Sequence, residues 1–240
     1  MAIFDLTTLR AVVFDTDGVV TDTARVHAAA WKHVFDAYLR GRCEPFDVRA
    51  DYLAHVDGRP RLDAVRAFLA SRGLSLPEGG PGDEPGAATV YGLWLAEDAL
   101  FAQEIGRHGV SAFPAAVTLL HELRHRGCRT GAVATGGHDR AALSSAGLLH
   151  LFDVLVDGED GTMPGGPGHD AMFLEAARRL GLEPGEVAIV AGMPPDAPGF
   201  GLVVTLAGGG RRTGAGTGAG TVVADLADVD VHGRVPVVLR

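Results

Sequence analysis

Short apolar runs alternate with amphipathic segments along the second half of the chain. Apolar residues at helical spacing predict helices over residues 114–126, 139–146 and 170–180. Continuous apolar runs predict strands over residues 129–135, 152–157, 187–192, 200–207 and 221–226. This alternation is typical of a parallel sheet that is covered by helices.

The first half of the chain follows a different pattern. One buried strand is expected at residues 10–15, and the chain after it is mostly helical, with helices expected over 23–40, 61–72 and 87–107. We therefore predict an α/β fold with a split core, residues 1–22 and 113–240. Residues 23–112 form a helical cap inserted after the first strand. The glycine-rich stretch 208–221 is expected to be a mobile loop, because no strand and helix frame it as they would a nucleotide-binding loop.

Composition narrows the classes of partner. The chain has 240 residues, of which 47% are hydrophobic, so it can bury a sizeable core. The formal net charge of −9 argues against nucleic acid or an anionic membrane as the main partner. A small phosphorylated ligand is still compatible with this charge, because it needs only a local cationic pocket.

The sequence also predicts a cytoplasmic protein. The first ten residues lack the apolar stretch of a signal peptide, and no apolar run reaches the roughly 18 residues of a membrane span. Two cysteines, Cys43 and Cys128, are too few for a disulfide framework and fit a reducing compartment. The oligomeric state is left open by the sequence.

Two carboxylates directly follow the first strand, in the segment VFDTDGVV. Ligands of open parallel sheets bind beyond the carboxyl ends of the strands, where Asp15 and Asp17 are expected. Asp15 could attack phosphorus as a nucleophile, and Asp17 could donate and later remove the proton of the leaving group. Gly18 would allow the backbone to turn closely past a ligand. The simpler alternative is an aspartate that caps the following helix.

The segment FDTDGVVTDTARVHAAAW resembles the first motif of the β-phosphoglucomutase-like branch of the haloacid dehalogenase (HAD) superfamily. The similarity continues in order through DYLAHVDGRPRLDAVRAFLASRG, TVYGL, LFDVLVDG, AMFLEAARRLG and GFGLVV, and so covers nearly the whole chain. The resemblance implies a Rossmann-like core with a helical cap. It also implies phosphoryl transfer through an aspartyl phosphate, with Mg²⁺, on a small phosphorylated metabolite.

The resemblance assigns roles to individual positions. Asp15 matches the nucleophile, Asp17 matches the acid and base, and both match metal-binding positions. Thr135 matches the hydroxyl that binds the transferring phosphate. Arg61 matches the cap arginine that holds a sugar's second phosphate, a task suited to a bidentate guanidinium. Further substrate-side positions are His27, Trp31 and His138, the last of which stands where the branch usually has asparagine.

Two charge-neutralising motifs of the family are missing. The lysine expected before the helix near residue 170 is absent, since the only lysine of the chain is Lys32. His169 is the one residue in reach that can carry a positive charge, and it would be at most partly protonated near pH 7. The acidic pair expected after the strand 187–192 is replaced by Ala191 and Gly192. We therefore predict weak Mg²⁺ binding at Asp15 and Asp17, unless Asp196 folds back toward them.

A third departure lies in the cap. Glu97 occupies a position where relatives carry a cation, and an anion facing a sugar phosphate would repel it. Three classes of function therefore remain open: an atypical phosphatase or phosphomutase, a pseudoenzyme that binds a ligand or partner, and a metal-independent acid–base enzyme that uses Asp15 or Asp17.

A different metal motif is present but weak. The segment HELRH, His121 to His125, matches a zinc-hydrolase pattern in which two histidines four residues apart bind Zn²⁺. Gly127 ends the helix at once and no third ligand follows at the usual spacing. We expect this helix to be a covering helix of the core.

Overall fold

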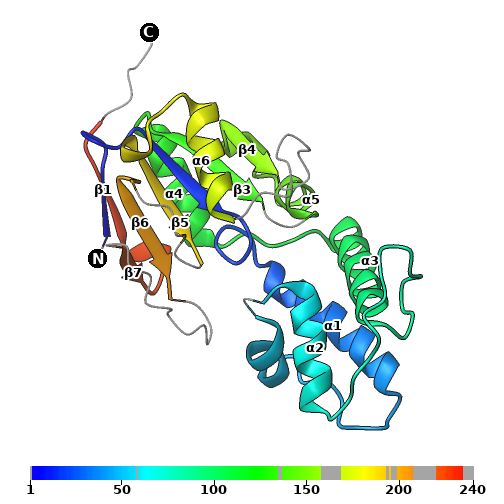
Figure 1. Ribbon diagram of the computed structural model, residues 1–240. Coiled ribbons are helices and arrows are strands. Elements are labelled where there is room, and N and C mark those ends of the chain that lie inside the picture. Colours follow the sequence, from blue (N-terminus) through cyan, green and yellow to red (C-terminus); the bar gives the residue numbers. More distant parts are fainter. Residues whose placement is uncertain are drawn as a thin grey trace. The chain divides into compact units, whose positions relative to one another are not determined.

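The computed structural model describes residues 2–57, 59–134, 137–157, 169–192, 195, 199–207 and 220–234, with only the backbone of His169. These residues form two compact units (Figure 1). The core unit contains the described residues up to Asp22 and from Val110 onward, and the cap unit is Thr23–Gly109. The second boundary therefore lies three residues before the predicted one. Backbone hydrogen bonds explain the difference: Asp22 N donates to Ser111 O (2.9 Å) and Phe113 N donates to Val20 O (2.9 Å).

Six described strands of the core form a parallel sheet in the order β4-β3-β2-β5-β6-β7. The strands are β2 (Ala11–Asp15), β3 (Arg129–Ala134), β4 (Val154–Asp157), β5 (Val187–Ala191), β6 (Leu202–Leu206) and β7 (Thr221–Val223). The parallel α/β sheet predicted from the hydrophobic pattern is confirmed. The first strand of this sheet, β2, lies at its centre between β3 and β5.

Alternate residues of β2 enter the two layers of the core. Val12 and Phe14 pack in the apolar cluster under α4 (Pro114–His125), whereas Ala11 and Val13 pack under α6 (His169–Leu180). The two helices cover opposite faces of the sheet (Figure 1). A strand buried on both faces reads as a continuous apolar run, which is why this pattern identified it. A shorter helix, α5 (Asp139–Ser145), follows β3.

A second, two-stranded sheet was not predicted. The strand β1 (Ala2–Asp5) pairs in parallel with β8 (Val229–His232), so segments from opposite ends of the chain lie side by side. Each strand has only four residues, which is too short for a reliable alternation of apolar and polar positions. The pairing is also non-local, and no short-range signal encodes it.

The cap is built on three helices, α1 (Thr23–Leu39), α2 (Arg61–Ser71) and α3 (Val90–His108), and α3 packs against the other two. Its core includes the rings of Phe35, Phe46 and Phe68. The helix α3 begins three residues later than predicted because Thr89 caps it, with Thr89 Oγ1 accepting from Gly92 N at 2.9 Å. No helix of the described chain is long and apolar enough to cross a membrane.

Short helical turns complete the described chain. One π-helical turn lies in the cap, and three 3₁₀ turns lie in the core. They are η1 (Tyr52–Val56), η2 (Leu149–Leu151), η3 (Pro184–Glu186) and η4 (Leu226–Asp228). The cysteines are both free thiols, and burial raises the pKa of Cys128 to about 11, so this thiol stays protonated at neutral pH.

Glycine at position 201 allows β6 to start close to η3. A Cβ there would lie 2.5 Å from Gly185 O and 2.8 Å from a methyl carbon of Leu9. We expect Gly201→Ala to lower the free energy of unfolding by about 1–3 kcal/mol, because the backbone at Gly185 must move. Urea denaturation measures the loss. Gly185→Ala is the matched control, since its Cβ would meet nothing closer than 3.7 Å. Equal losses in the two variants would show that this close approach is not the cause.

Candidate active site

Asp15 and Asp17 lie where the central strand β2 ends. Asp15 is the last residue of the strand and only 8% of it is exposed. The loop that follows is held by Thr16. Its carbonyl accepts from Val20 N (3.0 Å) and Thr21 N (3.1 Å), and its hydroxyl donates to Val133 O on β3 (3.2 Å). The two carboxylates are therefore attached to a loop whose backbone is fixed at both ends.

Gly18 makes the turn of this loop, as predicted. Its φ of +69° lies in the left-handed region, which side chains other than that of glycine adopt only with strain. The Gly18 N–H donates to Thr21 O at 3.1 Å, which closes the loop. The sequence analysis missed Thr16 and Thr21, although a threonine between two carboxylates at a strand end is a visible signal.

The strand β3 runs beside β2 with Asp15 opposite Val133. Thr135 follows two residues later, outside the described residues, so its assignment to phosphate binding stays a prediction. His138 is half-buried and immediately precedes α5. Its assignment to substrate binding is likewise untested.

The strand β5 borders β2 on the other side. Phe14 is the partner of Val190, so the next step along both strands brings Asp15 beside Ala191. Neighbouring strands lie roughly 4.8 Å apart, and residues in register project to the same face of the sheet. An acidic side chain at position 191 would thus stand next to Asp15, and in this chain an alanine methyl group stands there.

The described side chains do not fit a complete Mg²⁺ site. Mg²⁺ requires near-ideal octahedral coordination by oxygen. Asp15 and Asp17 offer carboxylates, but in the part of the chain that the structure describes no group of three His, Cys, Asp or Glu residues could hold a metal ion. Asp196 and the side chain of His169, the candidates for compensating groups, lie outside the described residues.

One further carboxylate at this edge of the sheet escaped the sequence analysis. Asp157 is the last residue of β4 and is buried, and its Oδ2 accepts from Arg140 Nε at 3.4 Å. β4 is separated from β2 by β3, so the two strand ends are roughly 10 Å apart. The signal was the same as for Asp15: an aspartate that directly ends an apolar run.

The cap holds a cluster of charged groups, defined by His27 on α1, Arg61 on α2 and Glu97 on α3. His27 Nδ1 and Glu97 Oε1 are 2.7 Å apart, and Arg61 Nη1 donates to Glu97 Oε2 at 2.8 Å. The His27 ring stacks on Phe101 with ring centres 3.7 Å apart. The cluster thus joins the three cap helices through one carboxylate.

The expectation that Glu97 faces a phosphate as an exposed anion is wrong. Glu97 is completely buried, and both of its oxygens are paired within the cluster. Burying a carboxylate is costly unless a cation and hydrogen bonds compensate it, and Arg61 and His27 provide these. Glu97 therefore neutralises the cluster from inside, while the Arg61 side chain keeps 31% of its surface exposed.

Two other cap residues, Trp31 and Lys32, make contacts within the cap itself. Trp31 is 1% exposed and stacks on Phe35 in the cap core, with ring centres 4.9 Å apart. Its assignment to substrate binding is not supported by this position and stays a prediction. Lys32 forms an ion pair with Asp36 at 2.7 Å and donates to Phe46 O at 3.0 Å, which connects α1 to the following loop.

The HELRH segment occupies α4, as expected for a covering helix. His121 and His125 are exposed, and Glu122 pairs with Arg126 at 2.6 Å. No third metal ligand accompanies them within the described ranges. The motif therefore gives no support to a zinc site.

Comparison with known sequences agrees with this architecture. A family model described as haloacid dehalogenase-like hydrolase matches residues 9–200. The β-phosphoglucomutases of Mycobacterium bovis and Mycobacterium tuberculosis are each 37% identical to the chain over 241 residues, covering 92% of this chain and 91% of theirs. The β-phosphoglucomutase of Bacillus subtilis is 26% identical over 183 residues.

Solved structures share the fold. CbbY from Rhodobacter sphaeroides, in complex with phosphate, matches with a TM-score of 0.66 and 19% identity over 92% of this chain and 96% of its own. The β-phosphoglucomutase from Clostridium difficile matches with a TM-score of 0.62 and 17% identity over 91% and 92% of the two chains. Since the family model spans most of the chain, and the mycobacterial relatives match nearly end to end, the chain belongs to the haloacid dehalogenase-like hydrolases and resembles their β-phosphoglucomutase branch.

Proposed function

We propose that this protein transfers the phosphoryl group of a small phosphorylated sugar through Asp15, at a much lower rate than relatives with a complete set of charges. The observation that carries the proposal is the position of Asp15 and Asp17 at the carboxyl end of the central strand, on a loop fixed by Thr16. The substrate class is supported by the relatives, which include β-phosphoglucomutases.

The proposed reaction has two steps. A carboxylate oxygen of Asp15 attacks phosphorus, and the bond from phosphorus to the sugar oxygen breaks while Asp17 donates a proton to that oxygen. The resulting aspartyl phosphate then passes its phosphoryl group to water or to a sugar hydroxyl, from which Asp17 removes the proton. Asp17 ends each cycle in its starting protonation state.

The lower rate follows from charge. A phosphate dianion that approaches the carboxylate of Asp15 meets like-charge repulsion, which a nearby cation normally cancels. The segment directly before α6 contains no lysine, and Ala191 stands beside Asp15 in place of an acidic metal ligand. Removing one stabilising group of this kind typically costs a factor of about 100–1000 in rate.

The test is a phosphate-release and mutase assay with β-glucose 1-phosphate and a generic phosphate ester, with excess Mg²⁺. We expect slow turnover that falls at least about tenfold in Asp15→Asn, because an amide is a poor nucleophile. Asp230→Asn, which removes an exposed carboxylate of the core, is the control and should keep the wild-type rate.

Two outcomes would count against the proposal. Equal rates for the protein and Asp15→Asn would exclude transfer through Asp15. Saturable sugar-phosphate binding without turnover would then identify a ligand-binding pseudoenzyme. Turnover as fast as that of a relative with a complete site would contradict the reduced rate and would show that other residues replace the missing charges.

A further inference from the structure

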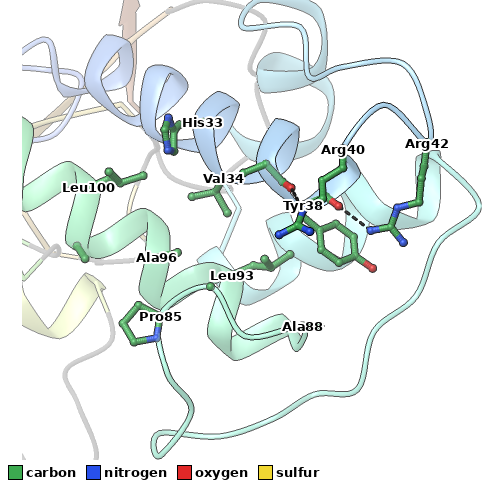
Figure 2. A pocket seen from close by; sticks show the side chains of 13 residues that line it. His33, Val34, Tyr38, Arg40, Arg42, Pro85, Ala88, Leu93, Ala96 and Leu100 are labelled. Atoms are coloured by element: carbon green, nitrogen blue, oxygen red, sulfur yellow. Dashed lines mark hydrogen bonds between the residues drawn. The ribbon is translucent and has the colours of Figure 1, made fainter.

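The cap contains a groove with a volume of about 500 Å³. None of the three residues of the charged cluster belongs to its lining. It runs between α1 and α3, and the loop with Pro85 and Ala88 borders one side (Figure 2). Its middle is apolar. The side chains there are Val34, Leu93, Ala96 and Leu100.

One end of the groove is cationic. Tyr38, Arg40 and Arg42 gather there, and His33 lies near the opposite end (Figure 2). The lining residues include no aspartate or glutamate, although the whole chain has a formal net charge of −9. Charge complementarity therefore favours an anionic occupant.

The two guanidinium groups are oriented by the end of α1. Arg40 Nε donates to Ala37 O at 3.3 Å, and Arg42 donates to Leu39 O (3.1 Å) and to Tyr38 O (2.6 Å). Arg42 also lies over the Tyr38 ring, 5.1 Å from its centre. Both Nη atoms of Arg40 and Nη1 of Arg42 make no hydrogen bond to any described residue, so N–H donors remain for an anion.

The backbone at Arg40 provides a second, independent observation. Arg40 has a φ of +47° and is the one non-glycine residue with positive φ in the described ranges. Helix ends adopt this conformation with glycine by preference, because a Cβ is strained there. A strained residue that the surrounding structure maintains often serves a function, and here it holds a guanidinium at the end of the groove.

We propose that the groove between α1 and α3 binds a small organic anion whose apolar body lies on Val34, Leu93 and Leu100 and whose charged group contacts Arg40 and Arg42. An aromatic or acyl group carrying a carboxylate, sulfonate or phosphate has this chemistry. The groove is lined by cap residues alone, and the proposal does not depend on the proposed phosphoryl transfer.

The test uses the fluorescent aryl sulfonate anilinonaphthalene sulfonate as the probe, titrated into the full-length protein. We expect saturable binding at one site, weakened about tenfold in Arg40→Gly through loss of a charge-assisted contact. The Tm of this variant should not fall, because glycine adopts positive φ without strain. Arg49→Gln, an exposed arginine of the cap outside the groove, should bind the probe like the wild-type protein.

A second variant locates the apolar part of the site. Ala96→Phe fills the middle of the groove and should reduce probe binding by about tenfold or more. Asp15→Asn should bind the probe like the wild-type protein, and β-glucose 1-phosphate should not displace the probe. Failure of the groove proposal is therefore distinguishable from failure of the proposed function. Unchanged affinity in both Arg40→Gly and Ala96→Phe, absence of saturable binding, or displacement by the sugar phosphate would each overturn the proposal.

Discussion

The double substitution Ala191→Glu with Gly192→Asp is expected to strengthen Mg²⁺ binding more than tenfold and to raise the rate of phosphoryl transfer. Asp15 lies beside position 191 on the neighbouring strand, at a spacing of roughly 4.8 Å. Two new carboxylates would raise the number of acidic side chains at these strand ends from two to four, and carboxylate oxygens suit a hard cation. Isothermal titration with Mg²⁺ measures the affinity, and the phosphate-release assay measures the rate.

The same variant should show a metal-dependent stability. Ala191 is fully buried, so a glutamate there is costly without a cation, and the variant's Tm should be low without Mg²⁺ and rise with its concentration. The control, Leu174→Glu with Val222→Asp, adds the same charge at exposed positions of the core and should leave Mg²⁺ affinity unchanged. If the wild-type protein already bound Mg²⁺ at micromolar concentration, another carboxylate would be completing the site.

The core was predictable because its sequence signals are local. The strand β2 is apolar on both faces and ends in Asp15. The helix α4 begins with Pro114 and ends just before Gly127, so the apolar spacing and the residues typical of helix ends predict the same helix. Such segments need no knowledge of their partners. The pairing of β1 with β8 could not be predicted, since it joins short segments 227 positions apart at their first residues, Ala2 and Val229.

The polar groups of the cap illustrate a different limit. Residue type and position suggested that Glu97 would repel a phosphate, but sign of charge alone does not reveal burial. His27, Arg61 and Glu97 are separated by tens of residues, and only the packing of three helices shows that they neutralise one another. The sequence identified two of the three residues by resemblance and misjudged the third because its partners were not visible.

Arg61→Met is expected to lower the free energy of unfolding of the cap by about 3 kcal/mol. The substitution leaves the fully buried Glu97 carboxylate with His27 as its one remaining partner in the cluster, and an uncompensated buried charge is strongly destabilising. Arg66→Met is the matched control. Arg66 lies on the same helix and pairs with the exposed residues Asp63 and Glu78, so its loss should cost much less than the loss of Arg61.

A double-mutant cycle measures the interaction energy between Arg61 and Glu97 separately from the contribution of each side chain alone. Glu97→Leu should cost less than Arg61→Met, because the Arg61 side chain is 31% exposed and water can solvate the cation that remains. The double variant should be more stable than Arg61→Met alone, since it removes the buried charge together with its partner. Urea denaturation of the four proteins gives the coupling. If Arg61→Met cost no more than Arg66→Met, Glu97 would not depend on Arg61, and Arg61 could serve a substrate at no cost to the cap. A large coupling energy would instead mean that Arg61 stabilises the cap. A role of Arg61 in substrate binding could then be tested only in variants whose cap is shown to remain folded.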